Sequence, residues 1–185
     1  MDFSYGEDQQ ALRELARKIL EEQATHDRLK EVKNGAERID RDLWRELAKA
    51  NLLGTAIPEA YGGSGMGLPE LMILAEEIGR AVAPLPVLPA LVEAALPIAE
   101  FGTEAQKKRW LTALASGDAI LTAALAEGPG AVVTAKKNDD GYRLTGKRPL
   151  VHAAHVAQCI VVPAKLGGSD ALFLVEPGAE GVTLE

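Results

Sequence analysis

Residues 104–126 read EAQKKRWLTALASGDAILTAALA, and the pattern of apolar residues changes in the middle of this stretch. In the first half, Trp110, Leu111 and Leu114 have the spacing of one helix face, and Gly117 is a plausible end of that helix. From residue 119 the chain becomes an uninterrupted apolar run, AILTAALA, of the length of a buried strand. The stretch therefore predicts a change from helices to strands near residue 117.

The residues before this change predict an all-helical domain over residues 1–117. Residues 8–24 place leucine, isoleucine and alanine at the i, i+3, i+4, i+7 spacing of an amphipathic helix. Thr103 and Gln106 form the capping-box pattern that starts the last helix, which ends at Gly117. The other predicted helices run from Asp40 to Gly54, from Pro69 to Gly79, and from the prolines at 84, 86 and 89 to about Phe101.

The residues after it predict a β domain over 118–185. Besides the apolar run, the sequences VVTAKK and YRLTG flank the turn NDDG at 138–141, and AQCIVVPA and DALFLVEP flank a turn at 166–168. Helices followed by strands indicate an α+β multidomain chain, an all-α helical bundle followed by an incomplete β-sheet or β-barrel domain. Four or five strands with open edges are expected to need further sequence or a partner.

Composition narrows the class of protein. The 185 residues carry a net charge of −7 without a basic face, which argues against a nucleic-acid binder. The polar start and the absence of a long apolar run predict a cytoplasmic protein with no membrane span. The single cysteine, Cys159, is expected to be a small core residue. His152 and His155 lack nearby carboxylates, so we expect no metal site and histidines that face solvent or bond backbone.

Three blocks, in order, carry a resemblance to a known family. Residues 53–65 (LGTAIPEAYGGSG), 68–80 (with EEIGR) and 101–117 (FGTEAQKKRWLTALASG) resemble the LG…IPEEYGGxG, ELxxxxEELGRA and FGTEEQKxxWLPxLASGE segments of acyl-CoA dehydrogenases. The glycines at 62–67 follow a helix and not a strand, so they do not predict a dinucleotide-binding loop but a tight turn beside the acyl pocket.

The resemblance implies a fold, a reaction and partners. Acyl-CoA dehydrogenases have an N-terminal helical domain, a middle β domain and a C-terminal helical domain, and usually form tetramers. They use FAD to oxidise an acyl-CoA thioester to the 2,3-enoyl-CoA, and an electron-transferring flavoprotein accepts the electrons. A glutamate removes the α proton. In the family this base lies in or near the C-terminal domain, so the resemblance implies no catalytic residue within 1–185 and a base beyond residue 185.

The resemblance also indicates where flavin would bind. Residues 124–130 (ALAEGPG) resemble the flavin loop LTEPGAGSD, with Ala126 in place of a flavin-bonding threonine. Residues 144–152 (LTGKRPLVH) resemble LNGTKxWITN, with Leu150 in place of tryptophan and His152 in place of threonine or serine. For Glu127, a structural role in bonding loop amides is expected rather than catalysis. The predicted cofactor-binding residues are Leu125, Ala126, Gly130, Leu150 and His152.

These departures leave three functions open. The first is an FAD-dependent acyl-CoA dehydrogenase subunit of lipid or steroid side-chain catabolism, in a homo- or hetero-tetramer. The second is a non-catalytic partner that does not bind FAD alone, because the lost flavin contacts resemble one subunit type of heteromeric steroid-degrading enzymes of actinobacteria. The third is an acyl-CoA oxidase or a flavin monooxygenase on the same fold.

Overall fold

The computed structural model describes residues 4–128, 130–139 and 141–185. Helices fill the first part of the chain and strands fill the second, as the change of pattern predicts, so the α+β fold class is confirmed. The helical elements are α1 (Glu7–Gln23), α2 (His26–Asn34), α3 (Arg41–Lys49), η1 (Glu59–Tyr61), α4 (Leu68–Arg80), η2 (Leu88–Ala95), α5 (Leu96–Phe101) and α6 (Glu104–Ala115). The strands are β1 (Leu121–Ala123), β2 (Val133–Asn138), β3 (Gly141–Gly146), β4 (Cys159–Leu166) and β5 (Ser169–Val175).

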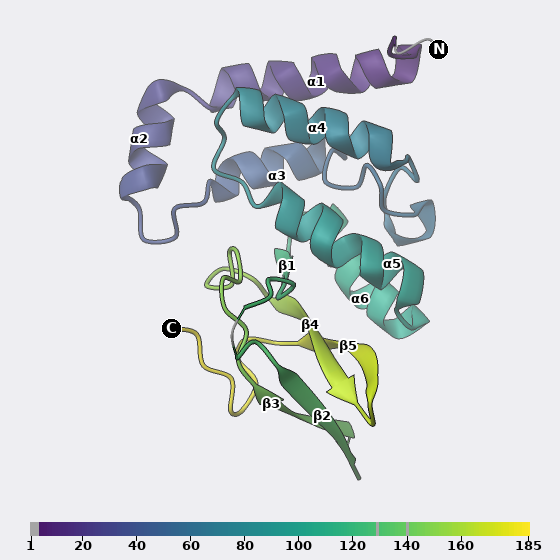
Figure 1. The fold of residues 1–185 in the computed structure, drawn as a ribbon. Helices are drawn as coiled ribbons and strands as arrows, with labels where there is room; N and C mark the ends of the chain where they lie inside the picture. Colours follow the sequence, from purple (N-terminus) through teal and green to yellow (C-terminus); the bar gives the residue numbers. More distant parts are fainter. Residues whose placement is uncertain (1–3, 129, 140) are drawn as a thin grey trace.

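Figure 1 shows the arrangement of the two parts: α1, α3 and α4 lie beside one another, and α5 and α6 lie between them and the sheet. One continuous core joins the parts. It contains Trp44 of α3, Leu74 of α4 and Leu111 of α6, and it extends to Leu121 of β1 and Cys159 of β4. Because β1 packs against η2 inside this core, the sheet is anchored to the helices by buried apolar contacts.

Side-chain caps account for where several helices begin. The Thr103 hydroxyl accepts a hydrogen bond from the Gln106 backbone N–H (3.3 Å), and the Gln106 side chain accepts one from the Thr103 N–H (2.8 Å), so the predicted capping box is confirmed. The Asp40 carboxylate caps α3 by accepting from the Leu43 N–H (3.1 Å). These bonds satisfy amide groups that have no partner within the helix.

The structure corrects four predicted elements. Helix α2 was not predicted, because its polar sequence HDRLKEVKN buries only Val32. Helix α3 ends at Lys49 and not at Gly54: Asn51 takes a left-handed φ of 56°, and the Leu52 N–H bonds back to the Leu47 carbonyl. The helix after the prolines is wider at its start, a π-helix over η2. The predicted strand 119–126 pairs only over Leu121–Ala123.

Strand β4 lies at the centre of the sheet. Its start pairs in parallel with β1, from Leu121↔Cys159 to Ala123↔Val161, and its end pairs in parallel with β2 at Lys165 and Leu166. Strand β5 pairs antiparallel along the whole of the other edge, and β3 forms a hairpin with β2. The predicted turn residue Asp140 lies outside the described residues. On the side of β4 that faces β1 and β2, neither of these two strands pairs with residues 162–164, which leaves a gap between them, whereas β5 pairs with the same residues on the other side.

The glycine segment after α3 forms a tight turn, as predicted, and not a phosphate loop. The amides of Ser64 and Gly65 donate to the carbonyls of Gly54 and Ile57, so the segment folds back on itself. Gly63 lies so close to this backbone that an added Cβ would be 2.0 Å from the Ile57 carbonyl oxygen. Only a residue without a side chain fits there.

We expect Gly63→Ala to lower the free energy of unfolding by about 2 kcal/mol, because the new methyl group must displace backbone atoms. Urea unfolding followed by circular dichroism measures the change. Gly79→Ala is the matched control: a Cβ at Gly79 in α4 meets nothing within 4 Å, so the same substitution should raise stability by about 0.5–1 kcal/mol. Equal effects at the two positions would contradict the close-approach argument.

Candidate functional site

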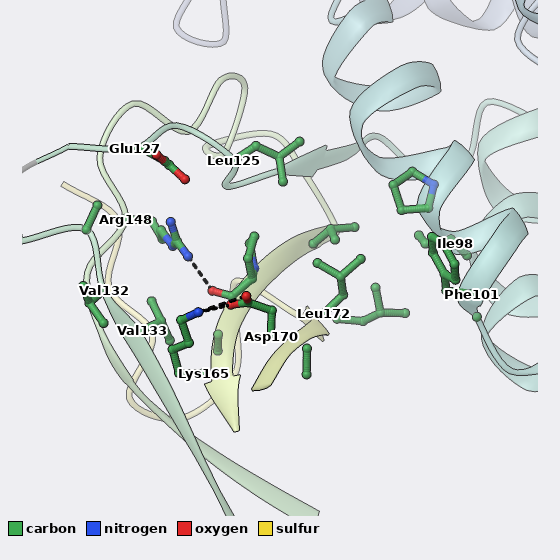
Figure 2. A pocket seen from close by; sticks show the side chains of 18 of the residues that line it. Ile98, Phe101, Leu125, Glu127, Val132, Val133, Arg148, Lys165, Asp170 and Leu172 are labelled. Carbon is green, nitrogen blue, oxygen red and sulfur yellow. Dashed lines mark hydrogen bonds and ion pairs between the residues drawn. The ribbon is translucent and has the colours of Figure 1, made fainter. Parts of the chain in front are cut away.

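A cavity of about 1100 Å³ lies between α5 and the open side of the sheet. Figure 2 shows Ile98 and Phe101 on the helix side and Arg148, Lys165 and Asp170 on the sheet side. The lining combines apolar residues with four ionisable ones: Ile98, Phe101, Leu125, Val132, Val161, Leu172 and Leu174 are apolar, and Glu127, Arg148, Lys165 and Asp170 are ionisable. The cavity is large enough for a ligand of coenzyme size, and its four ionisable residues lie on the sheet side among apolar ones.

Local structure fixes both walls. Helix α5 ends at Phe101, where Gly102 caps it by donating its N–H to the Ile98 carbonyl. This end leaves the Phe101 side chain 76% exposed at the cavity. On the sheet side, the predicted turn at 166–168 joins β4 to β5, and Gly167 and Gly168 take positive φ angles of 56° and 91°. The turn places Asp170 beside Lys165, whose Nζ lies 2.8 Å from its carboxylate.

The structure brings only one of the five predicted cofactor residues to the cavity. Leu125 lines it, and Ala126 follows, half-buried. Gly130 is exposed with a φ of 79°, and its neighbour Pro129 lies outside the described residues. Leu150 is 79% exposed with a left-handed φ of 54°. His152 is exposed, and its carbonyl accepts a hydrogen bond from the buried Thr122 hydroxyl (2.6 Å).

The side chains of these five residues offer too few hydrogen-bond donors to hold a flavin ring. A flavin ring presents carbonyl and ring-nitrogen acceptors that need donors, and buried acceptors without partners are costly. Among the five side chains, only the His152 imidazole bears a polar group. The remaining donors are the backbone N–H groups of this loop, including those of Leu125 and Ala126.

The other candidates take structural places. Cys159 is buried in the core as predicted, and burial raises the pKa of its thiol to about 12, so it is no nucleophile. His155 is exposed, and its Nε2 lies 2.8 Å from the Glu37 carbonyl oxygen, so it is bonded to backbone as expected. Glu127 is exposed at the cavity, and its expected bonds to loop amides are not seen in the described structure. No group of three or more potential metal ligands occurs among the described residues.

One charged cluster was missed by the sequence analysis. Glu77 of α4 is completely buried, and its carboxylate accepts hydrogen bonds from Arg13, Arg17 and Arg80 at 2.7–3.1 Å. The hydrogen bonds from Arg17, and then those from Arg13 and Arg80, lower the pKa of Glu77 from 4.5 to about 2 against the opposing effect of burial. The cluster joins α1 to α4 and lies apart from the cavity. The i, i+4 spacing of Arg13 and Arg17 was its only signal in the sequence.

Comparison with known proteins now identifies the family. The family model described as "Acyl-CoA dehydrogenase, N-terminal domain" matches residues 6–118. The chain belongs to the acyl-CoA dehydrogenase family. The resemblance of the three sequence blocks is therefore confirmed.

No helix among the described residues is long and apolar enough to span a membrane.

Relatives of this acyl-CoA dehydrogenase family member are about twice its length. Acyl-CoA dehydrogenase FadE27 of Mycobacterium tuberculosis is 38% identical over 188 residues, which cover all of this chain and 50% of that protein. FadE28 of the same organism is 32% identical over 187 residues, which cover all of this chain and 48% of the relative. The chain thus spans about half the length of these relatives.

Solved structures agree with the fold. A variant of the Tcur3481–Tcur3483 steroid ACAD has a TM-score of 0.89 and 46% identity, and the match covers 95% of this chain and 50% of that one. The ChsE4–ChsE5 complex from Mycobacterium tuberculosis has a TM-score of 0.91 and 37% identity, and the match covers 99% of this chain and 50% of that one. The first of these is named a steroid ACAD and the second a complex of two proteins, which matches the heteromeric subtype that the sequence resembles.

Proposed function

We propose that this chain is a subunit of an acyl-CoA dehydrogenase that oxidises an acyl-CoA thioester to the 2,3-enoyl-CoA in lipid or steroid side-chain catabolism. The observation that carries the proposal is the cavity between α5 and the sheet, whose largely apolar lining and ionisable residues on the sheet side suit an acyl group joined to a charged carrier. The similarity to the steroid ACAD and to the ChsE4–ChsE5 complex supports the steroid class and a heteromeric assembly.

This chain's own residues would bind and shield the acyl group and not abstract its proton. Ile98, Phe101 and Leu172 offer an apolar wall that removes water from the thioester's carbon chain, which strengthens the electrostatic interactions at the reacting atoms. No residue of 1–185 corresponds to the family's glutamate base, so we infer that the base comes from outside these residues. FAD, an electron-transferring flavoprotein as acceptor, a tetrameric assembly and a cytoplasmic location belong to the same proposal.

A second candidate function is favoured by one observation, the poor donor set of the flavin loops. With Ala126 and Leu150 in place of the expected threonine and tryptophan, the chain would act as the non-catalytic partner that completes a heteromeric enzyme without holding FAD alone. The cavity then supports a shared interface and not a second active site.

Flavin absorbance and turnover together test these functions. The chain is purified alone and after co-expression with candidate partner subunits, and each sample is scanned for visible flavin bands and assayed with octanoyl-CoA and an artificial electron acceptor. Flavin and turnover only with a partner would support the heteromer. Samples that stay colourless with every partner would refute the hypothesis that this chain is part of a flavoenzyme. Faster turnover with oxygen than with the acceptor would indicate an oxidase or monooxygenase.

We expect Ala126→Thr combined with Leu150→Trp to raise the affinity of the purified protein for FAD by about tenfold, from one added hydrogen bond and one aromatic contact. Quenching of flavin fluorescence on titration measures the affinity. The control, Ala11→Thr with Leu15→Trp, makes the same two changes at exposed positions on α1 and should have no effect. An unchanged affinity in the first variant would mean that residues outside 1–185 control flavin binding.

A further inference from the structure

Arg148 occupies the gap in the sheet at the cavity. Strand β1 pairs with β4 as far as Val161 and β2 pairs with it from Lys165, so neither strand reaches Pro163, which pairs only with Leu172 of β5 on the other side of β4. The Nη2 of Arg148 donates to the Pro163 carbonyl at 2.7 Å, as the dashed line in Figure 2 shows. The bond ties the guanidinium to the central strand, which gives the group a fixed position in the cavity wall.

Most donors of this guanidinium have no acceptor in the part of the chain that the structure describes. An arginine side chain has five N–H donors, and the Pro163 carbonyl accepts one of them. The Arg148 Nε is buried and has no hydrogen-bond partner among the described residues. A buried cationic donor without an acceptor is costly, and the rest of the half-buried guanidinium has N–H groups that an oxygen inside the cavity can accept from.

The neighbouring charges leave Arg148 as the available cation of the cavity. Lys165 also lines it, but its ammonium group is neutralised by Asp170, with contacts of 2.8 and 2.9 Å. Glu127 is exposed and forms no hydrogen bond or ion pair with Arg148, so the guanidinium has no carboxylate partner among the described residues. Opposite the charged wall lie Ile98 and Phe101 of α5. A ligand that fits this pattern has an apolar body and an anionic oxygen.

We propose that Arg148 is the residue of this chain that binds a phosphate group of the ligand in this cavity. The planar fork of a guanidinium matches two oxygens of a phosphate, and the Pro163 bond holds the fork in place before the ligand arrives. The phosphate belongs either to coenzyme A or to a flavin dinucleotide. The identity of these two candidate ligands rests on the proposed function, whereas the inference of an anionic ligand rests on the position and charge of the Arg148 guanidinium in the cavity wall.

Paired ligands with and without phosphate test the proposal. Isothermal titration calorimetry is run on the full chain, together with its partner subunit where one copurifies. The probes are octanoyl-CoA against S-octanoyl-pantetheine, and FAD against riboflavin. Arg148→Met should weaken binding of the phosphorylated member of one pair by about tenfold or more and leave its phosphate-free counterpart unchanged. The pair that responds identifies the source of the phosphate.

Two further variants keep the test decisive. Arg148→Lys retains the charge without the fork, so it should bind the phosphorylated probe with an affinity between those of wild type and Arg148→Met even if the methionine variant is less stable. Arg143→Met, on the exposed face of β3 and outside this cavity, removes the same charge and should change nothing. Equal affinities of wild type and both Arg148 variants for octanoyl-CoA and FAD would overturn the proposal. Calorimetry measures binding and not turnover. If the phosphate effect is present but the turnover assay described above detects no activity, only the proposed function is refuted.

Discussion

We expect replacement of Glu77 by glutamine to lower the free energy of unfolding by about 3 kcal/mol, because it removes the buried anion that three arginines share. The Glu77 side chain is 0% exposed, whereas the side chains of Arg13, Arg17 and Arg80 are 28%, 39% and 43% exposed. Water reaches the arginines, which reduces the free-energy cost of leaving their charges unpaired when the carboxylate is lost. We therefore place the effect at the lower end of the range for a broken buried ion pair.

The position of the cluster explains why one substitution has so large an effect. Arg13 and Arg17 lie on α1, and Glu77 and Arg80 lie on α4, so the carboxylate bonds the two helices to each other. A glutamine at position 77 retains one acceptor oxygen but brings two amide N–H groups to face cationic donors. The helix pair therefore loses the ion pairs that Glu77 forms and gains a local repulsion.

Glu76→Gln is the control for this prediction. Glu76 is the neighbouring residue on α4, and it also bonds Arg13, at 3.3 Å, but its side chain is 53% exposed. The same chemical change there should cost less than about 1 kcal/mol, as for other exposed ion pairs. Urea unfolding at pH 7 measures both variants. Equal losses of stability in the two variants would contradict a special role for the buried carboxylate.

We expect the protein to lose about 3 kcal/mol of stability between pH 5 and pH 2 through Glu77 alone. Its pKa is lowered from 4.5 to about 2 in the folded protein, first by the hydrogen bonds from Arg17. A group with a lowered pKa in the folded state stabilises the protein above its unfolded pKa, and the stabilisation disappears as the pH falls through the folded pKa. The magnitude follows from about 1.4 kcal/mol per pKa unit. Asp40, whose pKa is lowered by Arg28, adds a loss of the same sign.

Urea unfolding at several pH values from 7 to 2 measures this dependence. The wild-type protein and Glu76→Gln should lose stability together as the pH falls, whereas Glu77→Gln should start lower and change less. The two curves should therefore approach each other near pH 2. A Glu77→Gln variant that loses stability on acidification as steeply as wild type would show that other carboxylates cause the acid sensitivity.

The sequence-based predictions succeeded where an element depends on residues close together in the chain and failed where it depends on residues far apart. The capping box at Thr103 depends on residues three apart, and it was found correctly. Helix α2 was missed because its apolar content is low and its stability comes from contacts such as the Arg28–Asp40 pair at 2.7 Å, whose partners are 12 residues apart. The apolar run at 119–126 has the composition of a long strand, but the partner strand accompanies it for only three residues.

The candidate site was located only in part for the same reason. The motif resemblance pointed to the loops at 124–130 and 144–152, and Leu125 and Arg148 from these loops do line the cavity. Arg148 was not among the predicted site residues, because a lysine or arginine after a strand is usually a solvated charge. The position of Arg148 depends on its bond to the Pro163 carbonyl. This carbonyl is available because β1 pairs with the start of β4 and β2 pairs with its end, so neither strand reaches Pro163.

The change of pattern in residues 104–126 was sufficient by itself to determine that helices precede strands, since hydrophobic periodicity and end caps are local properties of the chain. The three motif blocks likewise determined the family. Only the tertiary structure decided that the helices and the sheet share one core, that Glu77 is buried among three arginines, and that the Arg148 guanidinium is held at a gap in the sheet. These features depend on residues far apart in the chain, and burial and strand pairing bring such residues together only when the whole chain has folded.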